Sequence, residues 1–370
     1  MSGLSTDLIT PAYGIRSLAD VLPAVVQALG VPGGRPGGLD LPAAPAYVVF
    51  LIDGLGAEQL TRYAEDAPYL ASLMETPGTA TVPSTTAVSL TSLGTGLLPG
   101  AHGVVGYTSR IPGTTDLLNA LHWPASVEPH RWQPHETVFG ALADRGKGAT
   151  VVTKREFFGS GLTAVSQRGA EFVAAERAGE RIAGAVEASR RSGIVYLYDS
   201  DLDWTGHKHG VNSAEWLQQL AMLDAEAERL RDELPAHVRL LVVADHGMVD
   251  SPLADRIDVD DEPALRDGLV MLGGEARFRH LYARSGAAED VAETWRAVLG
   301  ERAEVRTRAE ATEWFGPIAD SVAPRIGDVV VAARGTNAVM AAREFPKEGM
   351  LVGMHGSLTA EEMLIPILVD

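Results

Sequence analysis

An aspartate and a histidine four residues apart, Asp203 and His207, are the first side chains in this sequence whose types and spacing could do chemistry. They follow a short apolar run over 194–198 that is typical of a buried strand, so both are expected to project from the loop at its end. Open α/β sheets bind their ligands at this position. Oxygen and nitrogen ligands suit Zn²⁺, Mn²⁺ or Fe²⁺ better than Ca²⁺. Taken alone, the pair is more typical of solvated or capping residues.

Two further apolar runs end in a carboxylate in the same way. The run over 240–244 leads into Asp245 and His246, and the run over 46–52 leads into Asp53. A single strand that ends in an aspartate usually marks a turn. Three such strands have a different meaning if they are parallel neighbours, because their carboxyl ends then meet at one edge of the sheet. The pattern therefore predicts one composite site at that edge.

A dense group of threonines and serines over 79–95 supplies candidate nucleophiles. Pro83 and the apolar residues Leu90 and Leu93 fit a helix that begins near 84–86. A hydroxyl at the start of such a helix lies where the helix dipole favours an anion, and a plain capped helix terminus is the alternative interpretation. Coordination to a divalent cation would make the alkoxide accessible near neutral pH without a separate general base.

The chain contains no cysteine, so any metal must be held by histidine and carboxylate side chains. The candidate ligands are Asp53, Asp203, His207, Asp245, His246 and His355, with one hydroxyl from 84–89. This set is large enough for two metal ions, which together can clamp the attacking and the leaving oxygen of an in-line displacement. The pattern points to phosphoryl or sulfuryl transfer.

The elements that must position these residues indicate an α/β fold with a mostly parallel central sheet flanked by helices. Helices are expected over 18–29, 57–74, 171–191 and 212–234, and further strands over 150–153 and 363–369. Ser17 with Asp20 forms a capping pair for the first helix, and Asn212 is the expected cap of the last one. A loop rich in proline and glycine is expected over 31–38.

The sequence changes in character over 255–323, which is richer in charge. A helix over 288–299 between short strands at 277–283 and 303–307 predicts a small inserted α+β cap there, and the main sheet is expected to resume at 328–332. The predicted division is an N-terminal helix and loop over 1–44, a catalytic core over 45–254 and 324–370, and the cap over 255–323.

The formal net charge of −18 argues against a nucleic-acid-binding surface, which needs basic patches. An acidic protein can still bind small-molecule phosphate esters if bound metal ions supply the positive field. The first seven residues lack the pattern of a secretion signal, and no apolar stretch reaches the roughly 18–20 residues that span a bilayer. These features predict a cytoplasmic protein without a membrane segment.

The order of the motifs resembles that of the alkaline phosphatase superfamily. The motifs are Asp-Gly at 53–54, Pro-Ser-x-Thr at 83–86, Asp-x-x-Gly-His-x-x-Gly at 203–210, Ala-Asp-His-Gly-Met at 244–248 and His-Gly at 355–356. Within the superfamily, the pattern is most similar to the nucleotide pyrophosphatases/phosphodiesterases, and the similarity extends from about residue 46 to 370. Each motif alone is weak, whereas the five in this order are highly specific.

The resemblance implies two zinc sites, with Mn²⁺ as the alternative metal, one held by Asp203, His207 and His355 and the other by Asp53, Asp245 and His246. It also implies that Thr86 bridges the metals as the nucleophile. Thr86 is the match because it stands three residues after Pro83, and Ser84 and Thr85 are its nearest competitors. The implied reaction has two steps, through a phosphothreonine that is then hydrolysed.

The chain departs from the pattern of the family where nucleotides are bound. An aromatic residue usually follows the threonine and stacks on a nucleobase, but Ala87 stands there. Tyr107, with Thr108 beside it, stands near the place of an asparagine that assists the phosphate oxygens. Phe157 and Phe158 are candidates for the missing aromatic face, and core packing is an equal alternative for them.

The leading hypothesis is therefore a metal-dependent hydrolase of phosphate diesters or pyrophosphates of the nucleotide type. The first alternative keeps the scaffold but changes the substrate to a phosphomonoester, a phosphonate or a phosphosugar in a mutase reaction. The second alternative is a non-catalytic metal-binding homologue, which predicts missing ligands, whereas all six are present. A sulfatase is disfavoured because no Cys/Ser-x-Pro-x-Arg motif occurs.

Overall fold

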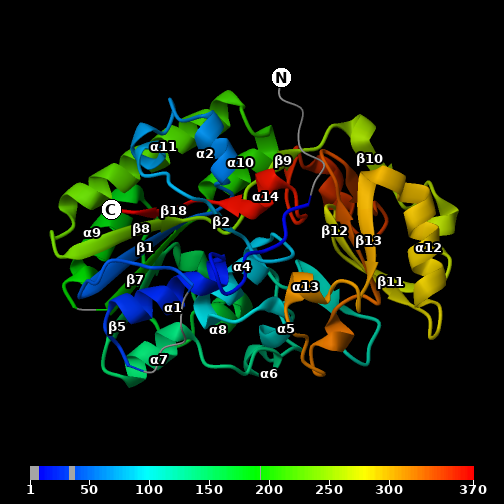
Figure 1. The fold of residues 1–370 in the computed structure, drawn as a ribbon, viewed down its shortest axis with the longest axis horizontal. Helices are drawn as coiled ribbons and strands as arrows, with labels where there is room; N and C mark the ends of the chain where they lie inside the picture. Colours follow the sequence, from blue (N-terminus) through cyan, green and yellow to red (C-terminus); the bar gives the residue numbers. More distant parts are fainter. Residues whose placement is uncertain (1–7, 33–37, 192) are drawn as a thin grey trace.

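The computed structural model describes residues 8–32, 38–191 and 193–370. Two sheets dominate the molecule, and they lie side by side with helices around them (Figure 1). The first seven residues and residues 33–37 of the loop expected over 31–38 lie outside the described range.

The main sheet has six strands in the order β18-β8-β1-β7-β5-β6. Its strands are β1 Ala46–Ile52, β5 Gly148–Thr153, β6 Glu171–Ala174, β7 Gly193–Asp199, β8 Val238–Val243 and β18 Ile367–Val369. All pairings are parallel except that of β18 with β8, which confirms the mostly parallel sheet of the predicted fold class. All seven residues of β1 are buried, which explains the continuous apolar run of this central strand.

Helices cover both faces of this sheet (Figure 1). One face carries α2 Ala57–Arg62, α9 Ala178–Ser189, α10 Asp201–His209 and α11 Ala214–Glu233. The other carries α1 Leu18–Ala28, α4 Thr86–Thr95, α7 Val138–Asp144 and α8 Gly161–Ser166. Shorter helices are α3 Pro68–Ser72, α5 Pro99–His102, α6 Pro129–Trp132, α13 Thr312–Phe315 and α14 Ala360–Met363.

The second sheet has four antiparallel strands in the order β11-β12-β14-β13. The strands are β11 Leu269–Glu275, β12 Phe278–Ala283, β13 Ala303–Thr307 and β14 Val329–Ala333, and α12 Ala288–Leu299 packs on them. The prediction that the main sheet resumes at 328–332 is wrong, because β14 pairs with β12 and β13. A buried strand has the same apolar sequence pattern in either sheet, so the pattern does not show which sheet it joins. The sheet thus extends beyond the predicted end of the cap, and the division into core and cap stays a prediction.

Four short two-stranded pairs occur among the described residues, and all but the local pair of β3 with β4 join distant parts of the chain. They are β2 Gly78–Thr79 with β17 Leu364–Ile365, β3 Thr108–Arg110 with β4 Leu117–Asn119, β9 Val249–Asp250 with β16 Gly353–Met354, and β10 Arg256–Asp258 with β15 Ala338–Met340.

Several predicted elements differ from the structure for local reasons. The helix expected over 57–74 is split into α2 and α3, since Pro68 disfavours helical backbone at the residue before it. The helix expected over 171–191 begins only at Ala178, because the preceding residues pair with β5 as β6. Ser213 rather than Asn212 caps α11, by accepting a hydrogen bond from the amide of Trp216 at 3.1 Å.

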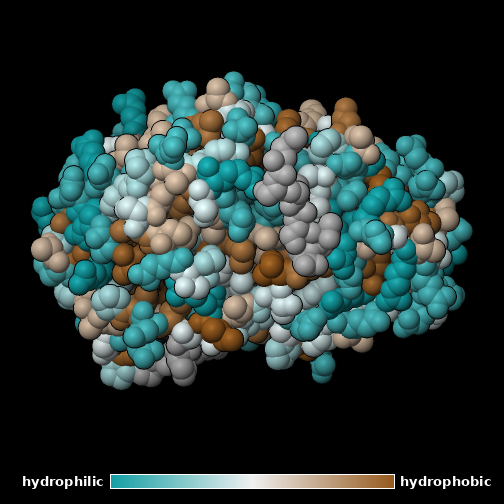
Figure 2. All heavy atoms as spheres, turned by 45° about the horizontal axis from the view of Figure 1, so that its top comes forward, coloured by the Kyte–Doolittle hydropathy of each residue, from teal (hydrophilic) through white to brown (hydrophobic). Residues whose placement is uncertain are grey.

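The surface of one face is mostly hydrophilic, with apolar residues in small separate groups (Figure 2). Among the described residues, no helix combines the length and the apolar character needed to cross a bilayer.

Candidate active site

Three neighbouring parallel strands bring their carboxyl ends together at one place, as the sequence predicts. β1 pairs with β7 on one side and with β8 on the other, in parallel register. Asp53 directly follows β1, and Asp245 follows β8 after one intervening residue, with His246 next to it. The backbone amide of Gly54 donates to Asp245 Oδ1 at 3.1 Å, so the segments that follow β1 and β8 are in direct contact.

The segment after β7 is a helix and not the loop that the sequence predicts. The side chain of Asp199 accepts a hydrogen bond from the amide of Asp201 at 2.8 Å, which satisfies a donor at the start of α10. Asp203 and His207 are four residues apart on this helix and therefore share one face. Gly54, at φ +76°, leaves room for Asp203, because a Cβ there would lie 3.0 Å from Cα and Cβ of this residue.

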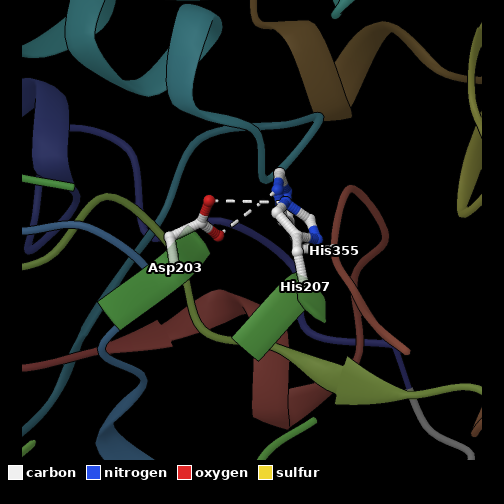
Figure 3. A group of neighbouring side chains, drawn as sticks. All are labelled: Asp203, His207 and His355. Atoms are coloured by element: carbon white, nitrogen blue, oxygen red, sulfur yellow. Dashed lines mark ion pairs between the residues drawn. The ribbon is translucent and has the colours of Figure 1, made fainter. Parts of the chain in front are cut away.

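Asp203, His207 and His355 form the first cluster of possible metal ligands (Figure 3). His207 Nε2 lies 3.3 Å from Asp203 Oδ2, and His355 Nε2 lies 3.7 Å from Asp203 Oδ1. Figure 3 shows the two histidines directed at the carboxylate, with His355 reaching it from outside α10. The structure thus brings together the three residues that the resemblance assigns to one metal.

A second cluster consists of Asp53, Asp203 and His246. His246 Nε2 lies 3.4 Å from Asp53 Oδ1 and 3.5 Å from Asp245 Oδ2. Asp203 therefore faces both clusters, whereas the resemblance assigns it to one metal only. Thr86, the first residue of α4, places Oγ1 3.2 Å from His246 Nε2.

The three histidines share a hydrogen-bond pattern that suits metal binding. Nδ1 of His207 lies 2.8 Å from the carbonyl of Gly353, that of His246 lies 2.9 Å from the carbonyl of Gly247, and that of His355 lies 2.9 Å from the carbonyl of Ser84. A carbonyl can only accept, so each Nδ1 carries the proton. Nε2 is then left with a free lone pair that faces the carboxylates, which is the tautomer a metal ligand needs.

The carboxylates also fit a cation, because three of their buried oxygens have no hydrogen-bond partner in the described part of the chain. They are Asp53 Oδ1, Asp203 Oδ1 and Asp245 Oδ2. Buried polar groups are normally paired, and an ion is one of the usual reasons for an exception. Burial, followed by the charges of Asp245 and Asp203, raises the pKa of Asp53 well above its usual value. Burial also lowers the pKa of His355 well below its usual value, with His246 and His207 contributing.

A cavity of about 770 Å³ opens next to Thr86, Asp53 and Asp203. Its wall includes the large apolar side chains Leu90, Leu121, Phe157, Leu162 and Trp204, and polar residues that include His122, Lys154, Glu156, Ser160, Thr163 and Gln167. The side chain of Trp204 is 68% exposed, although it lies within α10 between two predicted ligands. The cavity has the size and the mixed lining of a small-molecule site.

The four predicted substrate-binding residues are placed differently. Phe157 lines the cavity and packs edge-on against Tyr198. Phe158 packs against Phe172 and does not line it. Tyr107 and Thr108 are also absent from its wall, and the hydroxyl of Thr108 donates to the carbonyl of Gly274 at 2.8 Å.

Sequence reasoning missed two residues near the ligands. The hydroxyl of Tyr198 donates to Asp53 Oδ2, although the apolar run 194–198 predicts only a buried strand. Glu275 comes from the second sheet, and its Oε2 accepts a hydrogen bond from the hydroxyl of Thr85 at 3.2 Å. No motif marks Glu275, so only the tertiary structure reveals it.

Comparison with known proteins agrees with this geometry. The family model of the type I phosphodiesterases/nucleotide pyrophosphatases matches residues 47–358. No match was found among curated protein sequences. The structure of murine ectonucleotide pyrophosphatase/phosphodiesterase 5 superposes with a TM-score of 0.67 at 18% identity, over 88% of this chain and 87% of that one. An inactive variant of the murine protein, solved in complex with AMP, superposes with the same score at 17% identity and over the same shares.

Proposed function

This chain belongs to the type I phosphodiesterase/nucleotide pyrophosphatase family and has an alkaline-phosphatase-like fold, and from that premise we propose how its site works. The chain is a phosphodiesterase-type hydrolase. We propose that it cleaves phosphate diesters or pyrophosphates of nucleotides through a covalent intermediate on Thr86, with two divalent metal ions, for which Zn²⁺ is the expected metal.

The observation that carries the proposal is the position of Thr86. Its hydroxyl lies 3.2 Å from His246 Nε2, at the first residue of a helix and on the wall of the cavity. The dipole of α4 favours negative charge on that oxygen. The hydroxyl therefore meets both the ligand cluster and the space where a substrate would bind, as a nucleophile must.

The ligands divide into two groups that meet at Asp203. Asp203, His207 and His355 would hold one metal, and Asp53, Asp245 and His246 would hold the other, which Asp203 also faces and where Thr86 lies beside His246. When bound, the metals would supply Lewis acidity that favours the alkoxide of Thr86 and neutralises the charge on the phosphoryl oxygens. The chain itself orients the ligands through the three carbonyls that hold Nδ1 of each histidine.

The cavity supports a nucleotide as the substrate. Phe157 and Trp204 offer aromatic faces. In this chain they would take the role of the aromatic residue that usually follows the threonine, where Ala87 stands instead. Base–aromatic stacking contributes about 1–3 kcal/mol for each base. The murine protein of the same fold was solved in complex with AMP, which fits a nucleoside phosphate in this space.

Parallel assays with bis(4-nitrophenyl) phosphate, the 4-nitrophenyl ester of AMP and 4-nitrophenyl phosphate test the proposal. For the zinc-loaded enzyme we expect kcat/KM for the AMP diester to exceed that for the monoester by about 100-fold or more, because the site must hold the second ester group. A chelator should abolish all hydrolysis, and Thr86→Ala is the control for contaminating phosphatases. A preference for the monoester would refute diester specificity and favour the phosphomonoesterase alternative. No hydrolysis of any ester by metal-loaded protein would refute the proposed function.

A further inference from the structure

Glu275 is a mostly buried carboxyl group that the second sheet places next to the active site. It is the last residue of β11, and its side chain is 13% exposed. Oε2 accepts the hydrogen bond of Thr85 Oγ1 and lies 4.0 Å from Nδ1 of His355. Oε1 is buried and has no hydrogen-bond partner among the described residues. Nothing in the proposed chemistry uses this side chain.

Glu275 lies where two segments of the active site meet. Ser84 and Gly356 form an antiparallel bridge, in which the amide of Ser84 donates to the carbonyl of Gly356 at 3.1 Å. The amide of Gly356 donates to Ser84 Oγ at 3.2 Å, and His355 Nδ1 donates to the carbonyl of Ser84 at 2.9 Å. One segment continues into Thr85 and Thr86, and the other carries His355. The nucleophile and one metal ligand are therefore held on a shared junction.

The backbone of the second segment is shaped to fit Glu275. Gly356 has φ +126°, and a Cβ on it would lie 2.9 Å from both Cγ and Cδ of Glu275. Any larger residue at 356 would displace the carboxyl group. The close packing holds the carboxyl group against the junction, in reach of the hydroxyl of Thr85.

We propose that Glu275 is a positioning residue, which fixes the turn that carries Thr86 relative to the loop that carries His355. This inference rests on the proposed function, since it assigns Glu275 to the same site. The hydrogen bond from Thr85 orients the residue directly before the nucleophile, at the N-cap of α4. A small displacement of a nucleophile costs about 100-fold in rate, so an anchor at this point has a large effect without touching the substrate.

Steady-state kinetics on the AMP diester separate this role from a general structural one. For Glu275→Ala we expect kcat to fall about 10- to 100-fold, as is typical when a residue that supports a metal ligand is removed, while KM changes by less than about threefold. Glu275→Gln keeps an acceptor for Thr85 and should retain kcat within about threefold. Thr85→Val removes the donor and should lose about as much as Glu275→Ala. Because both substitutions break the same hydrogen bond, kcat of the double variant should fall no further than that of either single variant.

Glu304→Ala, which changes a half-buried glutamate in β13 of the same sheet, is the matched control and should leave kcat unchanged. Full kcat in Glu275→Ala would overturn the proposal, as would a rise in KM alone or losses that multiply in the double variant. If Glu275→Ala does not fold, Thr85→Val carries the test, and full kcat in that variant overturns the proposal as well.

Metal binding gives a readout that does not depend on the substrate. Competition with a chromogenic chelator should show one of the bound zinc ions held about tenfold more weakly in Glu275→Ala, because His355 is less well oriented. Unchanged affinity for both ions would overturn the positioning of His355. Wild-type protein that binds zinc but cleaves no ester would refute the proposed function, whereas the affinity comparison would still decide the role of Glu275.

Discussion

At the scale of single residues, Asp203 belongs to both clusters of possible metal ligands, the predicted one with His207 and His355 and a second one. The resemblance assigns it to one metal, whereas its two oxygens face His207 and His355 and its carboxylate also belongs to the cluster with Asp53 and His246. A carboxylate that lies between two cations stabilises both, because it offsets the charge of each.

Metal content should therefore respond differently to two substitutions. We expect Asp203→Asn to weaken both metals by about 10- to 100-fold, and His355→Ala to weaken one of them while the other stays bound. Metal analysis after dialysis against a graded chelator buffer measures both. Loss of a single ion in Asp203→Asn would show that the carboxylate serves one metal only, as the resemblance implies.

Thr86 allows a separation of metal binding from turnover. Thr86→Ala should retain both metal ions, since the six other ligands remain, and should lose about 10⁴-fold or more in kcat because the attacking oxygen is gone. Thr86→Ser keeps a hydroxyl and should recover much of the rate. If Thr86→Ala turns over normally, the nucleophile is Ser84 or Thr85.

At the scale of elements, a buried ion pair joins the second sheet to the segment that follows His355. Arg277, in the turn directly before β12, donates to both carboxylate oxygens of Glu362 in α14, at 2.8 and 2.6 Å, and both side chains are fully buried. Glu362 in turn accepts the amide of Ser357 at 3.0 Å and the hydroxyl of Thr359 at 2.6 Å. The second sheet is therefore part of the framework that positions the site.

Arg277→Met should destabilise the protein by about 3–5 kcal/mol, because it leaves the carboxylate of Glu362 buried without its partner. The double variant with Glu362→Gln should recover part of that loss, since no uncompensated charge is left. Arg229→Met, which removes an exposed pair with Glu233, is the control and should change the free energy of unfolding by less than about 1 kcal/mol. Denaturant unfolding at pH 7 measures all three, and a loss below 1 kcal/mol for Arg277→Met would contradict the role assigned to the pair.

The elements also show why some features could be predicted and others could not. The strand before Asp53 is a continuous apolar run, and the strand before Asp245 is apolar from Leu240 on, so the sequence alone predicts both strands and the convergence of their ends. The helix that carries Asp203 and His207 could not be predicted, because α10 has no apolar stripe. A side chain of the preceding strand, that of Asp199, accepts the amide of Asp201 at its start. The sheet to which β14 belongs was not readable either, since pairing partners leave no local signal.

At the scale of the whole molecule, two buried histidines link stability to pH. Burial lowers the pKa of His280 to about 4, and burial with the charges of His135 and Arg325 lowers the pKa of His102 to about 3. His280 donates through Nε2 to the carbonyl of Val105 and accepts the amide of Gly327, so it connects three segments in its neutral form. Protonation would break this arrangement.

The sign of the dependence follows from the lowered pKa values. In the unfolded chain each histidine takes up a proton below a pH of about 6.5, whereas the folded protein keeps both neutral, so stability is lost as the pH falls. Between pH 7 and 5 each contributes a loss of about 2 kcal/mol. His280→Gln should make the change in unfolding free energy between these pH values smaller by about that amount. Equal pH dependence in the variant and the wild type would contradict this.

The exposed position of Trp204 should make its fluorescence sensitive to ligand binding. Of the six tryptophans, Trp204 alone is largely exposed, at 68%, and it stands on the wall of the cavity beside Asp203. Collisional quenchers such as iodide should therefore reach this indole before the other five. A nucleotide that enters the cavity should shield it and shift its emission, so occupancy can be followed by fluorescence without a label. Trp204→Phe should remove that signal while the light from the buried indoles remains.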